Sequence, residues 1–309
     1  MPTRSPTIAQ TALLLIRERG PLPIDDLVQP IVDAGRTTAK DPSAAVERAI
    51  ANDPKLLRGW DDRWYSTFDQ LDGAIFTVRP TDLERREGIV LVRDELSLVA
   101  SLVPKRGWSL REPPYVDSFR HRFDLPSWGF DILDFDEDDW PIRDPARTIR
   151  AWVGNERADE LLRFAEDVGI PRDGDDETAL RRLVDGMAGM DVIQGPTKWI
   201  PDLDPDQLLG LAIDDGVVRA IAVDARRISE AHVEAAAKRI TALSRRVIGP
   251  DESWFGPPSI PIETLVAMIV TAEPGLLRRP LPPIGDVISR GGLVLDDGRI
   301  HHPGTPMAA

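Results

Sequence analysis

Seven side chains between residues 36 and 63 have the chemistry to contact the backbone of a nucleic acid and the edges of its bases. Arginine and lysine neutralise phosphates, while arginine, asparagine and serine can also hydrogen-bond to base edges. The candidate DNA-binding residues are Arg36, Lys40, Ser43, Arg48, Asn52, Arg58 and Arg63. The serine, the asparagine and Arg48 are spaced as the solvent-facing side of one helix, where a helix in the major groove carries its base contacts. The other four flank that helix, where we expect them to meet phosphates.

Groups for catalysis or metal binding are scarce in the chain. Its 309 residues include no cysteine, which removes disulfides, thiolate metal ligands and cysteine nucleophiles together. The four histidines are scattered, and the adjacent His301 and His302 are poor joint ligands because neighbouring strand residues point to opposite faces. We find no phosphate-binding loop, nucleophile elbow or HExxH motif. We therefore predict no catalytic residues, no metal and no cofactor, and we expect that the protein is not an enzyme.

Two short runs in the middle of the chain carry other chemistry. The acidic run DFDEDDW at 134–140 could hold a divalent cation, but it lacks the glycine and the spaced ligands of an EF-hand loop. A solvated acidic loop explains it better. The run SFRHRF at 118–123 could meet a nucleotide backbone, and an ordinary strand explains it equally well. An enzyme whose carboxylates come together from distant parts of the chain stays a third alternative.

The seven candidates lie in a segment that has the pattern of three helices followed by a hairpin. In residues 7–20 and 21–35, apolar side chains recur at helical spacing, and each stretch ends at a glycine. Asp41 followed by proline is typical of the start of a third helix. Residues 56–66 then alternate as two strands around an Asp-Asp turn. This order predicts a winged helix, with a shared core of Leu15, Ile16, Leu27, Ile31, Val46, Ile50, Leu57 and Trp64.

The same order of elements resembles the HARE-HTH family of winged helices. The matching pieces are ERGPLPIDDL, the DAGR turn, DPSAAVERAI and DPKLLRGWDDRWYS, and they cover about a fifth of the chain. Members occur in the RNA polymerase delta subunit, in some restriction enzymes and in chromatin factors. The resemblance implies either DNA binding or protein binding, because the family includes both.

Charge is distributed unevenly along the chain. The net charge is −14, yet residues 1–66 contain nine Lys/Arg and nine Asp/Glu, so the excess acid lies downstream. Strong nonspecific DNA binders carry a basic excess, because neutralised phosphates supply most of their affinity. A neutral segment can still bind DNA if its basic groups lie on one side. The alternative explanation is a solvated surface of mixed charge.

The middle region has the pattern of a mixed α/β structure. Thr81 and Glu84 have capping-box spacing between two strand patterns. Further on, helical patterns are followed by two strands around an Asp-Asp-Gly turn, at 156–168, 176–187, 208–213 and 217–223. Hairpins of this kind are typical of small β-barrels that hold an interaction surface.

The C-terminal region predicts three helices and a hairpin once more. Ser229 can cap the longest helix of the chain, and two shorter helices and two strands around an Asp-Asp-Gly turn follow. The long helix should face an apolar stripe on the next one, made of Ile262, Leu265, Val266, Ile269 and Val270. The stretches GPLPIDDLVQPIVDAG and RPLPPIGDVISRGG share a Pro-Leu-Pro entry and a glycine exit, which indicates a diverged repeat or a chance similarity.

Together these patterns predict an α+β protein in three parts. They are a winged helix at 1–67, a mixed α/β region with small β-barrel-like hairpins at 68–227, and a helical unit with a terminal hairpin at 228–309, which resembles a second winged helix. The leading hypothesis is a DNA-associated regulatory protein that binds duplex DNA through its N-terminal winged helix. The alternative is an adaptor whose winged helices dock on RNA polymerase or another complex.

The composition adds an expectation about where the protein works. No apolar run approaches the roughly 20 residues of a membrane span, and the run before Arg17 is too short for a signal peptide. We therefore expect a cytoplasmic protein with no membrane segment. Arginine outnumbers lysine, and alanine, aspartate and proline are abundant, which suggests a GC-rich bacterial genome.

Overall fold

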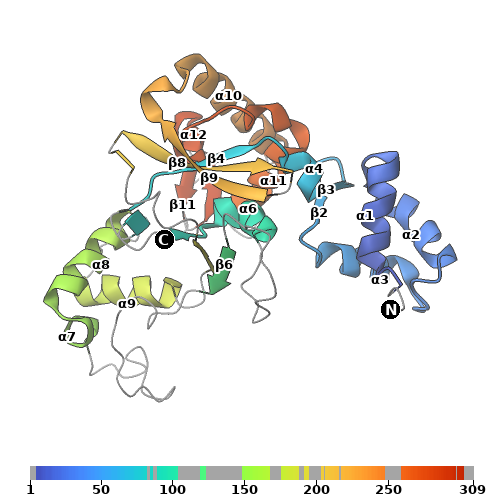
Figure 1. Ribbon diagram of the computed structural model, residues 1–309, viewed down its shortest axis with the longest axis horizontal. Helices are drawn as coiled ribbons and strands as arrows, with labels where there is room; N and C mark the ends of the chain where they lie inside the picture. The colour runs from blue at the N-terminus through green and yellow to red at the C-terminus, as the bar shows by residue number, and fades with distance from the viewer. Residues whose placement is uncertain are drawn as a thin grey trace. The chain divides into compact units, whose positions relative to one another are not determined.

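The structure is a computed structural model, and it describes residues 5–81, 84–85, 89–103, 119–122, 148–167, 175–187, 191–194, 203–204, 206–215, 217–247, 259–296 and 298–302. Within these residues the fold is mixed α/β, with helices and small antiparallel sheets of three strands each (Figure 1). The chain divides by packing into two compact units. The first comprises residues 1–78, 93–103 and 206–309, and the second comprises 79–92 and 104–205. The domain boundaries expected near residues 67 and 228 stay predictions.

The N-terminal module, residues 7–66, contains three helices and a small sheet. Its elements are α1 Ile8–Arg19, β1 Leu22–Pro23, α2 Ile24–Asp33, α3 Pro42–Ala51, β2 Leu56–Arg58 and β3 Arg63–Ser66. The three helices and the hairpin lie where the sequence predicts them, and the two-residue strand β1 is an addition to that prediction. β3 is the central strand, because it pairs with both β1 and β2.

Local signals fix the ends of these helices. Thr7 and Gln10 form a capping box at the start of α1, in which the Thr7 hydroxyl accepts the Gln10 N–H at 3.2 Å. Gly20 follows the same helix at a φ of +86°, a conformation that favours glycine. The carboxylate of Asp41 caps α3 by accepting the N–H of Ala44 at 3.1 Å. Helix α3 therefore begins at the position that the sequence predicts.

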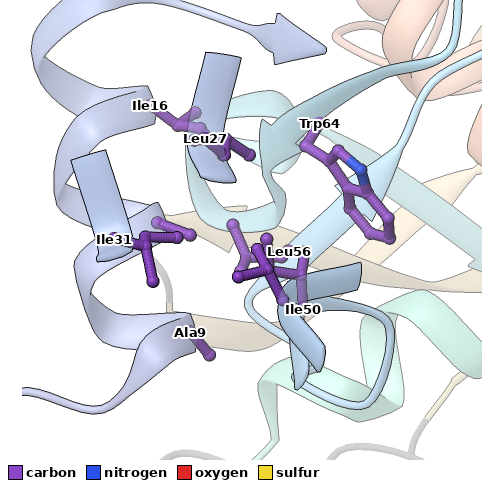
Figure 2. Packing of buried hydrophobic residues seen from close by; sticks show 9 residues of the cluster. Ala9, Ile16, Leu27, Ile31, Ile50, Leu56 and Trp64 are labelled. Atoms are coloured by element: carbon purple, nitrogen blue, oxygen red, sulfur yellow. The ribbon is translucent and has the colours of Figure 1, made fainter. Parts of the chain in front are cut away.

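The core of this module joins all three helices to the sheet (Figure 2). The buried cluster consists of Ala9, Ala12, Ile16, Leu27, Ile31, Val46, Ile50, Leu56 and Trp64. It includes six of the eight side chains expected there, and Leu15 packs against it half-buried. The expectation for Leu57 needs correction. Leu57 is buried but lies outside the cluster, and Leu56 takes its place, because adjacent strand residues point to opposite faces.

The C-terminal module, residues 230–302, also contains three helices and a three-stranded sheet. Its elements are α10 Glu230–Val247, β10 Ser259–Pro261, α11 Ile262–Ala272, the 3-10 turn η5 Pro274–Leu276, α12 Ile284–Arg290, β11 Val294–Asp296 and β12 Arg299–His301. The helices and the terminal hairpin are those the sequence predicts. The five apolar side chains of the expected stripe on α11 are all buried, and α11 packs on α10.

The two modules share one topology. In each, a helix, a short strand, two helices and a hairpin follow in order, and the last strand is central: β1-β3-β2 in one and β10-β12-β11 in the other. The pairing registers also correspond, since Pro23 pairs with Arg63 and Pro261 pairs with Arg299. Strand β1 and helix α2 of the N-terminal module therefore correspond to strand β10 and helix α11 of the C-terminal module.

This alignment corrects the repeat suggested by the sequence. The structure aligns PIDDLVQPIV at 23–32 with PIETLVAMIV at 261–270, and six of these ten positions are identical. The RPLPPIGDVISRGG stretch instead contributes α12, the third helix of its module. Its Pro-Leu-Pro entry is therefore not the counterpart of the entry to α2.

Other elements of the first unit form a third small sheet, and two short helices belong to the same set. They are α4 Thr67–Leu71, β4 Ile75–Val78, η1 Asp94–Leu96, α6 Ser97–Leu102, β8 Gln207–Asp214, β9 Val217–Asp224 and η4 Ala225–Arg227. The sheet has the order β4-β8-β9, and the predicted hairpin is present as β8 and β9. The described strands form an open row of three, and the β-barrel stays a prediction.

In its described residues, the second unit has a three-stranded sheet and the helices α7, α8 and α9. Its elements are β5 Ile89–Leu91, β6 Phe119–Arg122, α7 Ile149–Val153, α8 Asn155–Asp167, α9 Asp176–Met187 and β7 Asp191–Gln194, and the sheet order is β5-β7-β6. The predicted capping box is present: the Thr81 N–H donates to Glu84 at 2.9 Å and the Glu84 N–H donates to the Thr81 hydroxyl at 3.2 Å. The acidic run at 134–140 lies outside the described residues.

Candidate nucleic-acid interface

Helix α3 presents the predicted polar side chains to solvent. Val46 and Ile50 are fully buried on its inner side, which fixes the rotation of the helix. Ser43 and Arg48 are exposed on the outer side, and Asn52, the residue that ends the helix, is exposed as well. The three predicted base-contacting positions are thus accessible on one short helix.

Three of the five predicted cations have no acidic partner among the residues that the structure describes. Arg36 and Lys40 lie in the connection between α2 and α3, where Arg36 is half-buried and Lys40 is exposed. Within the described part of the chain, no carboxylate lies within 4.0 Å of Arg36, Lys40 or Arg48. The Nε of Arg36 is buried without a hydrogen-bond partner among the described residues. A phosphate would give the exposed Lys40 and Arg48 the charged partner that the described residues do not supply.

The two arginines of the β2–β3 hairpin are paired with acids. Arg58 lies 3.4 Å from Glu47 on α3 and 3.1 Å from Asp62 in the turn. Arg63 lies 3.8 Å from Asp61. All of these pairs are solvent-exposed, and exposed pairs of this kind stabilise a protein by only about 0–1 kcal/mol. Either arginine can therefore exchange its carboxylate for a phosphate at small cost, but neither adds free positive charge to the surface.

The turn of this hairpin is held by one tyrosine. The Tyr65 hydroxyl donates to Asp61 at 3.0 Å, and burial together with this bond raises the pKa of Tyr65 to about 12. A Cβ on Gly59 would lie 2.5 Å from the Tyr65 ring and 2.8 Å from the Asp61 carboxylate, so only glycine fits there without a shift. Asp62 adopts a φ of +60°. These contacts fix the position of the acids that face the two arginines.

A tryptophan projects from the same turn. Trp60 is 47% exposed, and the guanidinium of Arg246 on α10 lies 5.4 Å from the centre of its ring. This distance is within the range of a cation–π contact. Sequence reasoning missed this contact, because nothing local links two residues so far apart in the chain. It also missed the acidic partners of the wing, although the adjacent Asp61 and Asp62 were a visible signal.

Other kinds of site are not found in the part of the chain that the structure describes. No three His, Asp or Glu side chains there come together as metal ligands. Among the described helices, none combines the length and the apolar character needed to cross a membrane.

Comparisons with known proteins identify no relative of this chain. No protein-family model, no curated protein and no solved structure matches it. The resemblance of residues 7–66 to HARE-HTH winged helices therefore stays a prediction, and the case for a function rests on the geometry of the modules.

Proposed function

We propose that this protein is a DNA-associated regulator whose N-terminal module is a winged helix that binds duplex DNA. The observation that carries the proposal is that three predicted cations beside and on α3, Arg36, Lys40 and Arg48, have no carboxylate within 4.0 Å among the described residues. Residues 1–66 contain equal numbers of acidic and basic side chains, so this segment offers positive charge only where a basic side chain has no acidic partner. Its order of helices and strands is the one a winged helix requires. The C-terminal module has the same order, which supports a second winged helix.

In this proposal α3 enters the major groove. Arg48 can donate two hydrogen bonds to a guanine, and the exposed Ser43 and Asn52 can contact neighbouring bases. Arg36 and Lys40 neutralise phosphates beside the helix. Arg58 and Arg63 must first exchange their carboxylate partners for phosphates, so they contribute less to the binding free energy. The acidic charge lies in other parts of the chain, and at ~0.15 M salt it is screened beyond about 8 Å.

A salt titration of the full chain against mixed duplexes tests this proposal. Each phosphate contact steepens the plot of log affinity against log salt by about 0.9, so two to four contacts predict a slope of roughly −2 to −4. The triple variant Arg36→Ala, Lys40→Ala, Arg48→Ala should abolish binding. Its control, Arg226→Ala, Arg227→Ala, Arg239→Ala, loses the same amount of charge from exposed pairs elsewhere and should bind as the parent does. No binding by the parent at ~50 mM salt, where phosphate contacts are strongest, would exclude the proposal.

The second candidate is a protein-interaction adaptor that docks on RNA polymerase or another complex. It is favoured by the wing, where Arg58 and Arg63 are neutralised within the module while Trp60 is exposed. Tryptophan and arginine dominate the binding energy of protein interfaces. The Trp60→Ala variant distinguishes the two candidates when its binding to purified RNA polymerase core enzyme and to duplex DNA is measured. An adaptor loses its affinity for the polymerase, whereas a DNA binder keeps its salt-dependent duplex binding.

A further inference from the structure

The β2–β3 hairpin carries two tryptophans in opposite environments. Trp64 is 4% exposed and belongs to the core cluster of the N-terminal module (Figure 2). Trp60, in the turn of the hairpin, lies outside that cluster and is 47% exposed. The packing of the N-terminal module therefore accounts for Trp64 but not for Trp60.

Hydrogen bonds hold the backbone on both sides of Trp60. The Gly59 N–H donates to the Arg63 carbonyl at 2.7 Å, which closes the turn. The Tyr65 hydroxyl donates to the Asp61 carboxylate at 3.0 Å and ties the turn to the following strand. A side chain on a turn that is fixed in this way loses less conformational entropy when it binds a ligand. Trp60 is thus an exposed aromatic ring on a rigid support.

A cation from the C-terminal module lies over this ring. The guanidinium of Arg246, near the end of α10, is 5.4 Å from the centre of the Trp60 ring, and both residues belong to the first compact unit. Arg246 and its neighbour Arg245 are exposed, and no carboxylate of the described residues lies within 4.0 Å of either. Arginines in a last turn also complement the helix dipole, but that role needs no aromatic ring beside them. The wing therefore offers an aromatic ring and a positive charge side by side.

This pair of groups matches the chemistry of a nucleotide, which has a flat base next to a phosphate. Every base has a π-face, so bases of any kind can stack on an aromatic side chain. Within a duplex each base is stacked between its neighbours, so Trp60 can reach the face of a base only where that base is out of the stack. The acids of the turn do not oppose such a ligand with free charge, because Asp61 lies 3.8 Å from Arg63 and Asp62 lies 3.1 Å from Arg58.

We propose that Trp60 and Arg246 form a binding site for an unpaired nucleotide next to a duplex, in which the indole stacks on the base and the guanidinium pairs with its phosphate. This inference rests on the proposed function, because α3 holds the duplex to which the unpaired nucleotide is joined. It names the ligand class as DNA with a single-stranded extension. It also assigns one part of the interface to the C-terminal module.

Duplexes of one sequence with different ends serve as probes for the full chain. One is blunt, one has a single-stranded extension of about five nucleotides, and one has an extension of the same length made of abasic sugar-phosphate units. The abasic extension has the same charge but no bases, so it separates stacking from phosphate contacts. We expect the protein to bind the natural extension about 5- to 100-fold more tightly than the abasic one, the range for stacking one base on an aromatic side chain. Fluorescence anisotropy of labelled duplexes measures each affinity.

Variants identify the side chains that make the contact. Trp60→Ala should remove the preference for the natural extension and keep the binding of the blunt duplex, whereas Trp60→Phe, which keeps a ring, should retain most of the preference. Arg246→Ala should weaken the binding of both extensions and flatten their salt slope by about 0.7, the value for one phosphate of a single strand. Arg239→Ala is the matched control, because it removes an arginine that is paired with Glu273 on the same helix, and it should change neither quantity.

The outcomes separate this inference from the proposed function. If the protein binds the blunt duplex but does not distinguish the natural from the abasic extension, DNA binding stands and the stacking site is wrong. The site is also wrong if Trp60→Ala weakens blunt and extended duplexes alike, because the ring would then only hold the wing in place. It is equally wrong if Trp60→Ala leaves the preference unchanged and lowers the affinity for RNA polymerase core enzyme, since the ring would then belong to a protein interface. Absence of binding to every duplex at ~50 mM salt overturns both proposals.

Discussion

The two modules share one topology but differ in the partners of their surface arginines. In the N-terminal module, Arg48 lies on the outer side of α3 with no acidic partner among the described residues. At the corresponding end of the C-terminal module, Arg290 on α12 is paired with Glu230, and Arg299 is held by two hydrogen bonds to Ser259 at 2.8 and 3.2 Å. The C-terminal wing also exposes the apolar side chains of Val294 and Leu295. The difference teaches that the core pattern sets the topology, while a few surface pairs decide which module can offer charge to a ligand.

The largest expected effect is the loss of stability when a core leucine is removed from either module. Leu27→Ala and Leu265→Ala remove the same side chain from aligned, fully buried positions. Each should lower the free energy of unfolding by about 2–5 kcal/mol, with the larger loss for Leu265→Ala because α11 also packs on η1 and α6, outside its module. Chemical denaturation of the full chain measures both. Leu14→Ala is the control: its side chain is 60% exposed and the change should stay within about 0.5 kcal/mol. Equal, small losses at both core positions would show that the two helices are not equivalent core elements.

A second prediction separates the modules by sequence preference. Arg48→Ala should reduce the preference for a favoured duplex over mixed duplexes by about 1–3 kcal/mol, since a bidentate contact to guanine is lost. Arg290→Ala removes an arginine from the third helix of the other module, where it is already paired with Glu230, and should leave the preference unchanged. Competition binding with a selected duplex measures both. If Arg290→Ala has the larger effect, the C-terminal module is the one that reads DNA.

A third prediction compares the two wing arginines that occupy the same register. Arg63 and Arg299 pair with Pro23 and Pro261, respectively. Arg63→Ala should weaken binding to all duplexes alike and flatten the salt slope by about 1, because one phosphate contact is lost. Arg299→Ala should leave the slope unaltered, because Ser259 holds that side chain. A slope that does not change in either variant would limit the interface to α3 and its flank.

The smallest expected effects are changes of stability with pH. The N-terminal module should lose stability at alkaline pH and the C-terminal module at acidic pH. The pKa of Tyr65 is raised to about 12, so the neutral phenol is favoured in the folded state. The stability it contributes is complete below pH 10 and is lost as the pH rises from about 10 to 12. Tyr65→Phe should remove this alkaline loss. Thermal unfolding across this range measures it, and an unchanged alkaline profile in the variant would contradict the assignment.

His302 acts at the other end of the pH scale. Burial, and then the nearby Arg245, lower its pKa, so the neutral imidazole is favoured in the folded state. Its contribution is complete above the ordinary histidine pKa of about 6.5 and is lost as the pH falls through the lowered value. His302→Asn should flatten the acid side of the stability profile without changing the alkaline side. Thermal unfolding between about pH 4 and 7 provides the measurement.

Much of the fold was predictable because its signals are local. Asp41 and its following proline define the start of α3, and the Asp-Asp-Gly turns define two hairpins within a few residues. Strand β1 has only two residues, too few for any periodic pattern, so its pairing with β3 was not visible. The true repeat was missed because Pro-Leu-Pro strings were compared in place of aligned apolar positions. A Pro-Leu-Pro string identifies only a local turn, whereas a buried apolar pattern has its spacing fixed by packing.

The candidate site was predictable only in part. The helix pattern correctly placed Ser43, Arg48 and Asn52 on the exposed side, because Val46 and Ile50 had to face inward. Which cations would be free could not be read from the sequence. The pairing of Arg58 with Glu47 joins a strand to a helix, and α11 packs on α6, which lies more than a hundred residues away in the chain. Contacts of this kind depend on tertiary packing, for which one sequence carries no direct signal.

The similarity of residues 23–32 and 261–270, which are identical at six of ten positions, has a consequence for how the chain is made. Tandem units of similar sequence are prone to misassembly, because one can take the other's place in a partly folded chain. All elements of the N-terminal module lie between residues 7 and 66. During synthesis it can therefore complete its core before the ribosome has produced residues 261–270. A full-length chain refolded from denaturant has both segments present at once. We expect that the order of synthesis, rather than any difference between the two segments, keeps each helix in its own module.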